Sequence, residues 1–433
     1  MKLPFNGGTS GVRAVATASV FVWLAACSDL PTASPARATK TVAAASSRDL
    51  TAVDPCQEGT LSSTGAEWLI CVPGTWNGSV IVWAHGYVRP GLDLKIPDDK
   101  VDGTPIKDIA LGLGFAYATT SYRSNGLAAV DGSHDVEDLL ALFRTMVGKP
   151  TLAYLVGASE GSLSSILALE RPNTKFNGGL AVCGPIGSFR GQIDYFGDFR
   201  VLFDYFFPGV LPGTAIDIPQ NLIDDWDGIY TPAVLQAITA NPSATQQLLR
   251  VSHAPIDAND LTTVGTTVLG ILWYNVFATN EAKERLGGNP YDNRRRLYLG
   301  SSNDLLLNAT VARFSASPTA LLNLRAFETS GALRRPVVSL HTTGDPIIPF
   351  WQQTLYQLKV FAAPNTAPFA GFPVFRYGHC TFTEAEVLAG FALLVQETGG
   401  SLTVPAAVLP NRTMESQFLE LARSRGANPT VIH

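Results

Sequence analysis

Short apolar runs alternate with amphipathic segments through the first half of the chain. The apolar runs lie at residues 68–72, 79–84, 115–120, 152–156 and 180–183. Between them, residues 106–113, 136–147 and 162–170 carry apolar side chains at the spacing of a helix face. This alternation predicts an α/β fold, in which a mostly parallel sheet is flanked by helices on both faces.

The alternation stops after residue 184 and resumes at residue 336 with an apolar run, a helical pattern, a second run and a final helix. These four elements are expected at residues 336–340, 352–361, 373–376 and 383–397. The stretch between the two halves has helix-like pieces at 232–238, 244–251 and 264–277. Because a structureless gap of this size is implausible in a compact domain, we expect a core of residues 55–184 and 336–433 that is interrupted by a mainly helical cap at 185–335.

Aromatic residues gather near the start of the predicted cap. The cluster includes Tyr195, Phe196, Phe199 and Phe203. Packing of the cap onto the sheet would explain this cluster, and so would a lid that lines a pocket for an apolar or aromatic substrate. Both interpretations stay open, and under the second these four residues are substrate-pocket candidates.

The N-terminus has the pattern of an export signal. After Lys2 and Arg13, residues 14–26 carry no charge, and this run is too short to span a bilayer. We therefore predict a signal peptide at residues 1–26. The ending Leu-Ala-Ala-Cys resembles that of a bacterial lipoprotein, which implies cleavage before Cys27 and a lipid anchor on its thiol. The alternative is an ordinary signal peptide followed by chance by a cysteine, so the protein is expected in the cell envelope or secreted.

Residues 27–54 are rich in Ala, Ser, Thr and Pro and predict a flexible tether. Beyond Cys27 the chain has four cysteines, Cys56, Cys71, Cys183 and Cys380. An even number in an exported protein suggests two disulfides. Three pairings are possible; Cys56 with Cys71 closes the shortest loop and would leave Cys183 with Cys380, while four free thiols are the alternative.

Charged residues make up only 15% of the chain, and the net charge is -5. The longest basic run is three arginines at residues 294–296. Since nothing supplies a stripe of charge to neutralise phosphates, a nucleic-acid partner is not expected. No protein partner is predicted either.

The pentapeptide Gly157-Ala158-Ser159-Glu160-Gly161 lies between a predicted strand and a predicted helix. Its two glycines permit the sharp turn that lifts a serine above the end of a sheet. By itself the pattern is common, but this context predicts that Ser159 is a nucleophile.

A serine hydroxyl needs a base to take its proton, and the base needs an acid to orient it. Of six histidines, His379 lies in a late loop after the last predicted strand, where a base can reach the strand ends. Asp345 directly follows the resumed strand, whereas the alternative acids Asp292 and Asp304 lie in the insertion. The resulting order Ser159, Asp345, His379 is that of α/β-hydrolases.

An oxyanion hole requires backbone N–H groups directed at the developing negative charge. One is expected from Glu160, which follows the nucleophile. Another is expected from Gly86 or Tyr87, in the turn after an early strand. His85, just before them, is interpreted as a residue that orients this turn.

With these residues assembled, the chain resembles α/β-hydrolase esterases and related peptidases over residues 66–400, the insertion excepted. The matching segments are residues 84–86, 157–161, 341–349 and 378–380. The resemblance implies acyl transfer through an acyl-enzyme, with water as the final acceptor and no cofactor.

Cys380, directly after the histidine, also resembles the tannase and feruloyl-esterase group. There a disulfide joins the residue after the base to the residue before the nucleophile. This chain departs from that pattern, since Ala158 precedes Ser159. Cys183 is the candidate substitute partner, and such a bridge would hold the His379 loop near the sheet.

The leading hypothesis is a hydrolase of carboxylic esters, acting on small or polymeric substrates. A peptidase of the prolyl or acyl-peptidase type is the first alternative. It predicts an acidic pair or an arginine in the pocket that holds a substrate amine or carboxylate, and Glu160 is a candidate for this role. A hydrolase-fold protein that binds without catalysis is the second alternative.

Overall fold

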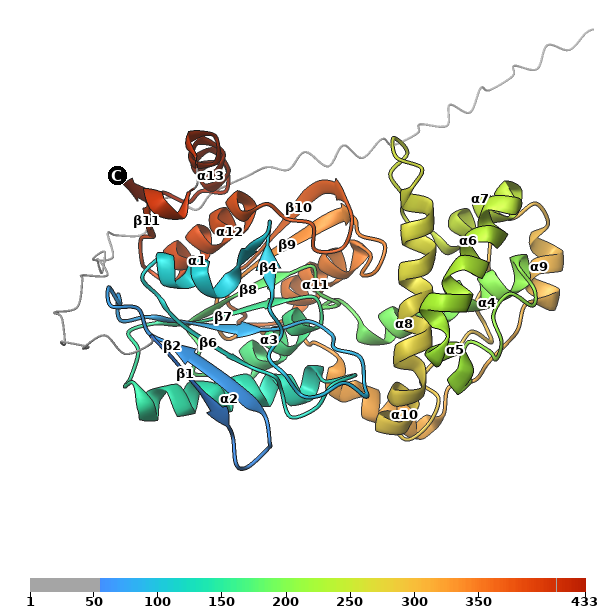
Figure 1. Cartoon of the computed structure of the whole chain (residues 1–433), viewed down its shortest axis with the longest axis horizontal. Helices are drawn as coiled ribbons and strands as arrows, with labels where there is room; N and C mark the ends of the chain where they lie inside the picture. Colours follow the sequence, from blue (N-terminus) through green and yellow to red (C-terminus); the bar gives the residue numbers. More distant parts are fainter. Residues whose placement is uncertain (1–54, 410) are drawn as a thin grey trace, which may run out of the picture. The chain divides into compact units, whose positions relative to one another are not determined.

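The computed structural model describes residues 55–409 and 411–433 (Figure 1). The predicted signal peptide, Cys27 and the tether at 27–54 lie outside the described residues. An eight-stranded sheet forms the centre, in the order β1-β2-β6-β3-β7-β8-β9-β10. Its strands are β1 (Cys56–Thr60), β2 (Glu67–Cys71), β3 (Val80–Ala84), β6 (Ala116–Thr120), β7 (Ala153–Ala158), β8 (Gly178–Val182), β9 (Val337–Gly344) and β10 (Phe369–Tyr377).

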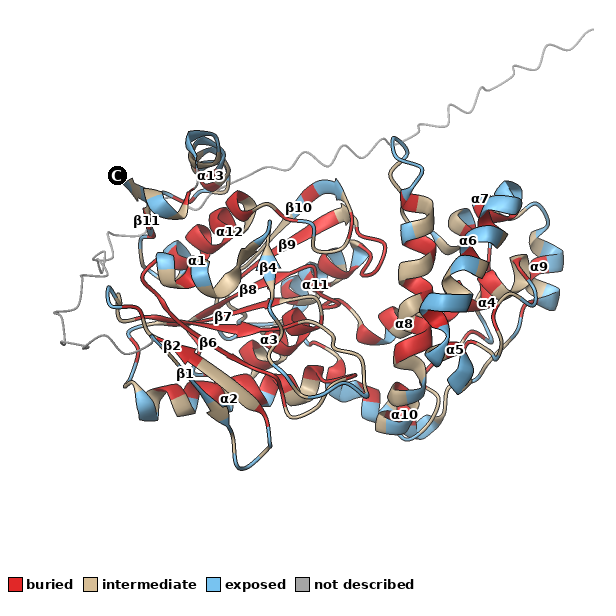
Figure 2. Ribbon diagram, viewed as in Figure 1, coloured by how far each residue is buried: buried red, intermediate tan, exposed pale blue. Residues whose placement is uncertain are grey.

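The strands from β6 to β10 are parallel, and β1 and β2 extend the sheet as an antiparallel edge. All five residues of β3, Val-Ile-Val-Trp-Ala, are buried. Such an uninterrupted apolar strand suits a parallel sheet, because both of its faces are covered. The central strands are accordingly buried along most of their length (Figure 2).

Alternate residues of each strand pack against different helices. Ile81 and Trp83 join a core that includes α1 (Ile106–Gly112) and α12 (Glu384–Glu397). Val80 and Val82 join the opposite core. The helices on that second face are α2 (Ala129–Met146), α3 (Glu160–Glu170) and α11 (Trp351–Ala362). The predicted parallel sheet with helices on both faces is confirmed, and the architecture is of the α/β-hydrolase type.

A helical insertion separates β8 from β9, as the break in the sequence pattern predicts. Its helices are α4 (Phe189–Phe206), α5 (Gln220–Asp224), η1 (Trp226–Tyr230), α6 (Thr231–Ala240), α7 (Pro242–Ser252), α8 (Thr263–Leu286), α9 (Asp304–Thr310), α10 (Pro318–Asn323) and η2 (Leu324–Phe327). Its buried residues, among them Phe199, Phe203 and Leu272, form a cluster that Ile347 and Ile348 from the loop after β9 also join. It is therefore a packed unit and not an extended loop.

The remaining elements lie outside the central sheet. They are the hairpin β4 (Lys100–Val101) and β5 (Thr104–Pro105), β11 (Thr403–Pro405), η3 (Ala406–Val408), α13 (Arg412–Ser424) and β12 (Thr430–Ile432). Phe418 of α13 is fully buried in the core that α12 shares with the sheet. The C-terminal segment thus adds a second layer over α12.

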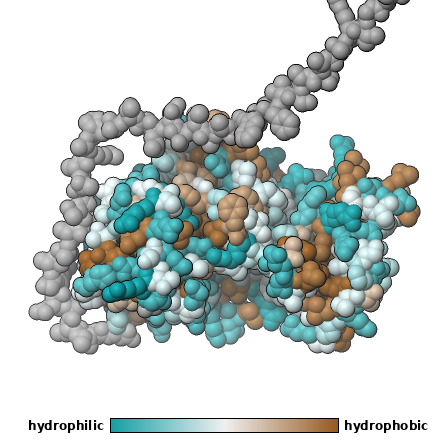
Figure 3. All heavy atoms as spheres, turned by 90° about the horizontal axis from the view of Figure 1, so that it is seen from above, coloured by the Kyte–Doolittle hydropathy of each residue, from teal (hydrophilic) through white to brown (hydrophobic). Residues whose placement is uncertain are grey.

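Among the described residues, no helix combines the length and the hydropathy needed to cross a membrane. The face in Figure 3 shows groups of hydrophobic residues among hydrophilic ones.

Candidate active site

The turn from β7 into α3 places Ser159 in a backbone conformation that is unusual for a residue with a side chain. Its φ is 54° and its ψ is -126°. The flanking glycines are required by space, because a Cβ on Gly157 would lie 2.3 Å from the Gly161 carbonyl oxygen, and one on Gly161 would lie 2.0 Å from the Ala84 carbonyl oxygen. The Ser159 N–H donates to the Val182 carbonyl at 2.9 Å, which ties the turn to β8. The hydroxyl is thereby presented at the end of the sheet, as a nucleophile elbow requires.

Ser159, His379 and Asp345 form one line of hydrogen-bonding atoms. His379 Nε2 lies 3.0 Å from Ser159 Oγ, and His379 Nδ1 lies 2.7 Å from Asp345 Oδ2. The three residues follow the ends of β7, β10 and β9. The serine and the histidine are 220 residues apart in sequence. This geometry permits the hydroxyl to pass its proton to the imidazole, while the carboxylate fixes the tautomer.

Asp345 is fully buried and is held by its own loop. Its Oδ1 accepts the N–H groups of Ile347 and Ile348, each at 2.9 Å. His341, also fully buried, lies with Nε2 2.7 Å from the Ile348 carbonyl oxygen and 3.6 Å from Asp345 Oδ2. Burial lowers the pKa of His341, which favours its neutral form. The alternative acids bond locally instead: Asp292 pairs with Arg294, and Asp304 accepts from Gly300 and Ser301.

Gly86 lies directly against the nucleophile, since a Cβ built on it would be 3.3 Å from Ser159 Cβ. The N–H groups of Gly86, Tyr87 and Glu160 donate to no other residue in the described part of the chain. They are therefore open to a substrate oxygen, as an oxyanion hole needs.

His85 supports this turn, as predicted. Its ring stacks on Tyr122 with centroids 3.9 Å apart, and its Nδ1 lies 2.7 Å from the Gly86 carbonyl oxygen. Burial lowers the pKa of His85, so the ring is neutral at pH 7 and its contribution is orientation.

Two cavities meet at Ser159. The larger, here called the sheet-side cavity, has a volume of about 330 Å³ and lies between the α1 and α12 helices and strands β3, β7 and β8. The smaller, here called the cap-side cavity, has about 80 Å³ and reaches α4 and α8 of the insertion. Tyr87, Ser159 and Tyr274 line both cavities.

The structure divides the four aromatic pocket candidates. Phe196 lines the cap-side cavity. Phe199 and Phe203 are fully buried inside the insertion and line neither cavity, so the prediction that they contact substrate is wrong. They lie on the face of α4 that packs against the other cap helices. Tyr195 also lies outside both cavities, and its hydroxyl donates to the Pro346 carbonyl at 2.9 Å, next to Asp345.

The sequence pattern missed the residues that form most of the larger cavity, such as Ala110, Leu388 and Tyr274. Their spacing along the predicted helices indicated only that they face the core. The alternation of apolar positions does not indicate where a helix stands away from the sheet.

Glu160 is a buried carboxyl beside the nucleophile. Its Oε1 accepts the Ala128 N–H at 2.9 Å, at the start of α2. Glu281 accepts the neighbouring Leu127 N–H at 3.0 Å. Burial raises the pKa of Glu160 to about 8, with a smaller contribution from the Glu281 charge. At pH 7 this carboxyl is therefore mostly neutral and links α2 to the nucleophile turn.

We expect Glu160→Gln to remove a pH dependence of stability. Because the folded pKa of about 8 exceeds the ordinary value of 4.5, the folded protein keeps an extra proton between these values. Stability conferred by the wild-type carboxyl is present at low pH and is lost as pH rises through this window. Thermal melts from about pH 5 to about pH 9 should show the wild type losing several degrees relative to Glu160→Gln. Glu284→Gln, at an exposed position, is the control and should follow the wild type. The same change of melting temperature with pH in wild type and Glu160→Gln would contradict the expectation.

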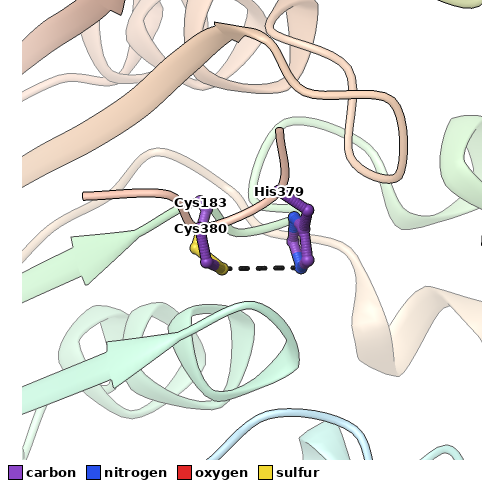
Figure 4. A group of neighbouring side chains, drawn as sticks. All are labelled: Cys183, His379 and Cys380. Carbon is purple, nitrogen blue, oxygen red and sulfur yellow. Dashed lines mark hydrogen bonds between the residues drawn. A yellow bond between two sulfur atoms is a disulfide. The ribbon is translucent and has the colours of Figure 1, made fainter. Parts of the chain in front are cut away.

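Two disulfides are present, Cys56–Cys71 and Cys183–Cys380. The second joins the residue after β8 to the residue after the histidine, as the resemblance led us to expect. Since Val182 pairs with Ala158 in the parallel register, Cys183 lies beside Ser159 and can take the place of a cysteine before it. Figure 4 shows this bridge next to the His379 ring, with Cys380 Sγ 3.5 Å from Nε2.

The group Cys183, His379 and Cys380 has the residue types of a metal site, with ligand atoms within 4.8 Å of one another. Both sulfurs are bonded in the disulfide, so neither is a thiolate that could bind zinc. The geometry favours a structural bridge here.

Replacing Cys183 and Cys380 together with alanine should lower kcat by about tenfold to a hundredfold, because a shift of about 1 Å in the base is costly. Steady-state assays well below the melting temperature would measure this. The double variant Cys56→Ala, Cys71→Ala is the control: it removes a bridge at the β1–β2 edge and should lower stability by about 3 kcal/mol with little change in kcat. Equal kcat values for all three proteins would show that the bridge near His379 does not position the base.

Comparison with known proteins gave no matching family model and no matching curated protein. Solved structures do resemble the chain. Feruloyl esterase B from Aspergillus oryzae is 16% identical with a TM-score of 0.39, covering 76% of this chain and 74% of that one. Candida antarctica lipase A is 12% identical with a TM-score of 0.41, covering 86% and 85%. The acylaminoacyl peptidase of Pyrococcus horikoshii is 11% identical with a TM-score of 0.36, and the match spans 76% of this chain but only 38% of the peptidase.

Proposed function

We propose that this chain is a serine hydrolase that cleaves carboxylic esters through an acyl-enzyme on Ser159. The observation that carries the proposal is the continuous line from Ser159 Oγ through His379 to Asp345, at 3.0 and 2.7 Å. This line ends at two cavities in which a substrate carbonyl can approach the hydroxyl.

The proposed reaction has two halves. In the first, Ser159 Oγ attacks the ester carbonyl carbon as its proton passes to His379 Nε2, and the carbonyl oxygen gains negative charge beside the Gly86, Tyr87 and Glu160 N–H groups. The C–O bond to the alcohol then breaks, and the imidazolium returns the proton to the leaving oxygen. In the second half, His379 deprotonates a water that attacks the acyl carbon. The bond from that carbon to Ser159 Oγ then breaks, Oγ takes the proton back from the imidazolium, and the acid product leaves.

The environment of Glu160 supports the ester proposal over the peptidase alternative. A peptidase that recognises a substrate amine needs an available carboxylate, and Glu160, which follows Ser159 in sequence, is the acid that lines the cap-side cavity. Its carboxyl is bonded to the start of α2, and burial raises its pKa to about 8, so it offers little negative charge at pH 7. The peptidase alternative therefore has less support.

Labelling with a fluorophosphonate probe tests the proposal. The wild-type protein should label, Ser159→Ala should not, and the exposed Ser302→Ala in the insertion should label as the wild type does. Rates on p-nitrophenyl esters and on aminoacyl anilides should then differ in favour of the esters. A folded wild-type protein that neither labels nor cleaves would favour the non-catalytic alternative, and faster anilide cleavage would favour a peptidase.

We also propose that the protein is exported and anchored through a lipid on Cys27. The sequence pattern supports this, and the two disulfides suit an oxidising compartment. Incorporation of labelled fatty acid in the producing cell, abolished by Cys27→Ser, is the expected result. Export with no lipid incorporation would instead indicate an ordinary signal peptide.

A further inference from the structure

The sheet-side cavity occupies a position where the core of an α/β protein is normally filled. Its walls come from alternate residues of three central strands, including Ile81, Val156 and Leu180, and from α1 and α12 opposite them. Protein interiors are close-packed, so an accessible volume of about 330 Å³ against the central strands is unusual. This volume falls within the range of about 300–1,000 Å³ that is typical of ligand sites.

Ala110 shows why the cavity is open. On α1 it faces the sheet with an exposure of only 2%, between the larger Ile106, Ile109 and Leu113. A single methyl group at this position leaves space that a longer side chain would fill. The cavity therefore depends on a small residue at one point of its wall.

The lining of the sheet-side cavity identifies the chemistry of its occupant. Away from the triad, its polar groups are Asp99 and Lys100, from the segment of the β4–β5 hairpin, and the hydroxyls of Tyr87 and Tyr274 near the mouth shared with the cap-side cavity. Asp99 accepts the Trp83 indole N–H at 2.7 Å, and Lys100 pairs with Asp98 at 2.9 Å, so both have partners. The rest of the wall is aliphatic or aromatic. A hydroxyl buried against this hydrocarbon part of the wall would lose its hydrogen bonds to water, so most of the cavity suits a plain hydrocarbon group.

The cap-side cavity is about a quarter of the size, at about 80 Å³ against about 330 Å³. Because Ser159 lines both, the two groups attached to the scissile ester can extend in different directions from one carbonyl. The larger group fits only the sheet-side cavity. The site is thus asymmetric, with space for one long chain and one small group.

We propose that the substrates are esters with an aliphatic chain, which lies in the sheet-side cavity along β3, β7 and β8 while the smaller group occupies the cap-side cavity. This inference rests on the proposed ester hydrolysis and specifies its substrate class. It applies to a chain on either the acyl or the alcohol side of the ester, and the experiment separates the two.

Two homologous series test the substrate class on the full-length protein: p-nitrophenyl esters with acyl chains from acetate to palmitate, and alkyl acetates from methyl to hexadecyl. In one series kcat/KM should rise by about fourfold per methylene until the cavity is full, since each buried methylene contributes about 0.8 kcal/mol. The series that rises identifies the side of the ester that carries the chain. A flat profile in both series would overturn the inference.

Substitutions in the cavity walls test where the aliphatic chain of the substrate binds. Ala110→Phe should lower the ratio of long-chain to short-chain kcat/KM by about tenfold or more, because the new ring takes the space of several methylenes. The smaller change Ala110→Leu should lower it less, and this graded response keeps the test valid if the phenylalanine variant folds poorly. Ala240→Phe, at an exposed alanine of α6, is the matched control and should leave the ratio as in the wild type.

Ala278→Phe distinguishes the two cavities, because Ala278 lines the cap-side cavity and not the sheet-side one. If the ratio of long-chain to short-chain kcat/KM falls in Ala278→Phe and not in Ala110→Phe, the aliphatic chain binds in the cap-side cavity and the inference is wrong. Failure of the proposed function has a different signature, namely no ester cleavage and no fluorophosphonate labelling at any chain length.

Discussion

Replacing His379 with alanine should lower kcat by a thousandfold or more, while the protein remains folded. The imidazole is the only group within hydrogen-bonding distance of the Ser159 hydroxyl among the described side chains. Without it, a neutral hydroxyl must attack the ester unaided. The His379 side chain is only partly exposed, at 18%, and it lies in a loop, so its truncation should change the melting temperature little.

Steady-state rates on a p-nitrophenyl ester, together with thermal melts, would measure the loss in His379→Ala. His134→Ala, on the exposed face of α2, is the control and should keep wild-type rates. If His379→Ala keeps more than about a tenth of the wild-type kcat, a different base acts on Ser159 and the assignment of the triad fails.

Asp345→Asn should lower kcat by about 10⁴-fold, because an amide at this position favours the wrong tautomer of the base. The asparagine oxygen can still accept the Ile347 and Ile348 N–H groups, so the loop should keep its shape. The amide nitrogen, however, would face His379 Nδ1, which then has to act as an acceptor. Nε2 would carry the proton and could not receive one from Ser159.

The same substitution at the other candidate acids provides the controls. Asp292→Asn and Asp304→Asn alter carboxylates that bond within the insertion, and neither should reduce kcat by more than about twofold. A large loss in either of them, with a small loss in Asp345→Asn, would place the catalytic acid in the insertion. Circular dichroism of all three variants would confirm that the comparison is between folded proteins.

Much of the site could be predicted from local signals. Gly157 and Gly161 bracket a serine between a strand and a helix, and the fold explains both glycines through close backbone contacts. Asp345 and His379 each follow a strand, and parallel strands bring their carboxyl ends to one edge of the sheet. The order of the three residues therefore contained enough information to assemble the triad.

The cysteine at 183 was harder to place. Its neighbour across the sheet is fixed by the register of β7 and β8, which pairs Ala158 with Val182. Register depends on side-chain packing across strands and cannot be derived from a single strand. The pairing of Cys183 with Cys380 accordingly came from elimination and resemblance, while its position beside Ser159 emerged only from the fold.

The aromatic cluster shows a different limit. Phe196, Phe199 and Phe203 are close in sequence, yet only Phe196 reaches a cavity. A helix presents successive residues in different directions, so proximity in sequence does not assign a common role. Hydrophobicity alone could not distinguish a side chain that lines a cavity from one that packs against the other helices of the insertion.

The insertion is attached to the loop that carries Asp345, the proposed catalytic acid. From α4, the Tyr195 hydroxyl donates to the Pro346 carbonyl at 2.9 Å, and Gln192 Nε2 donates to the Ile347 carbonyl at 2.7 Å. One helix thus helps to shape the smaller cavity and also holds the residues next to Asp345. Exchanging this helical segment to enlarge the smaller cavity would disturb Asp345 as well, so grafts that keep both anchoring side chains should retain turnover better than grafts that discard them.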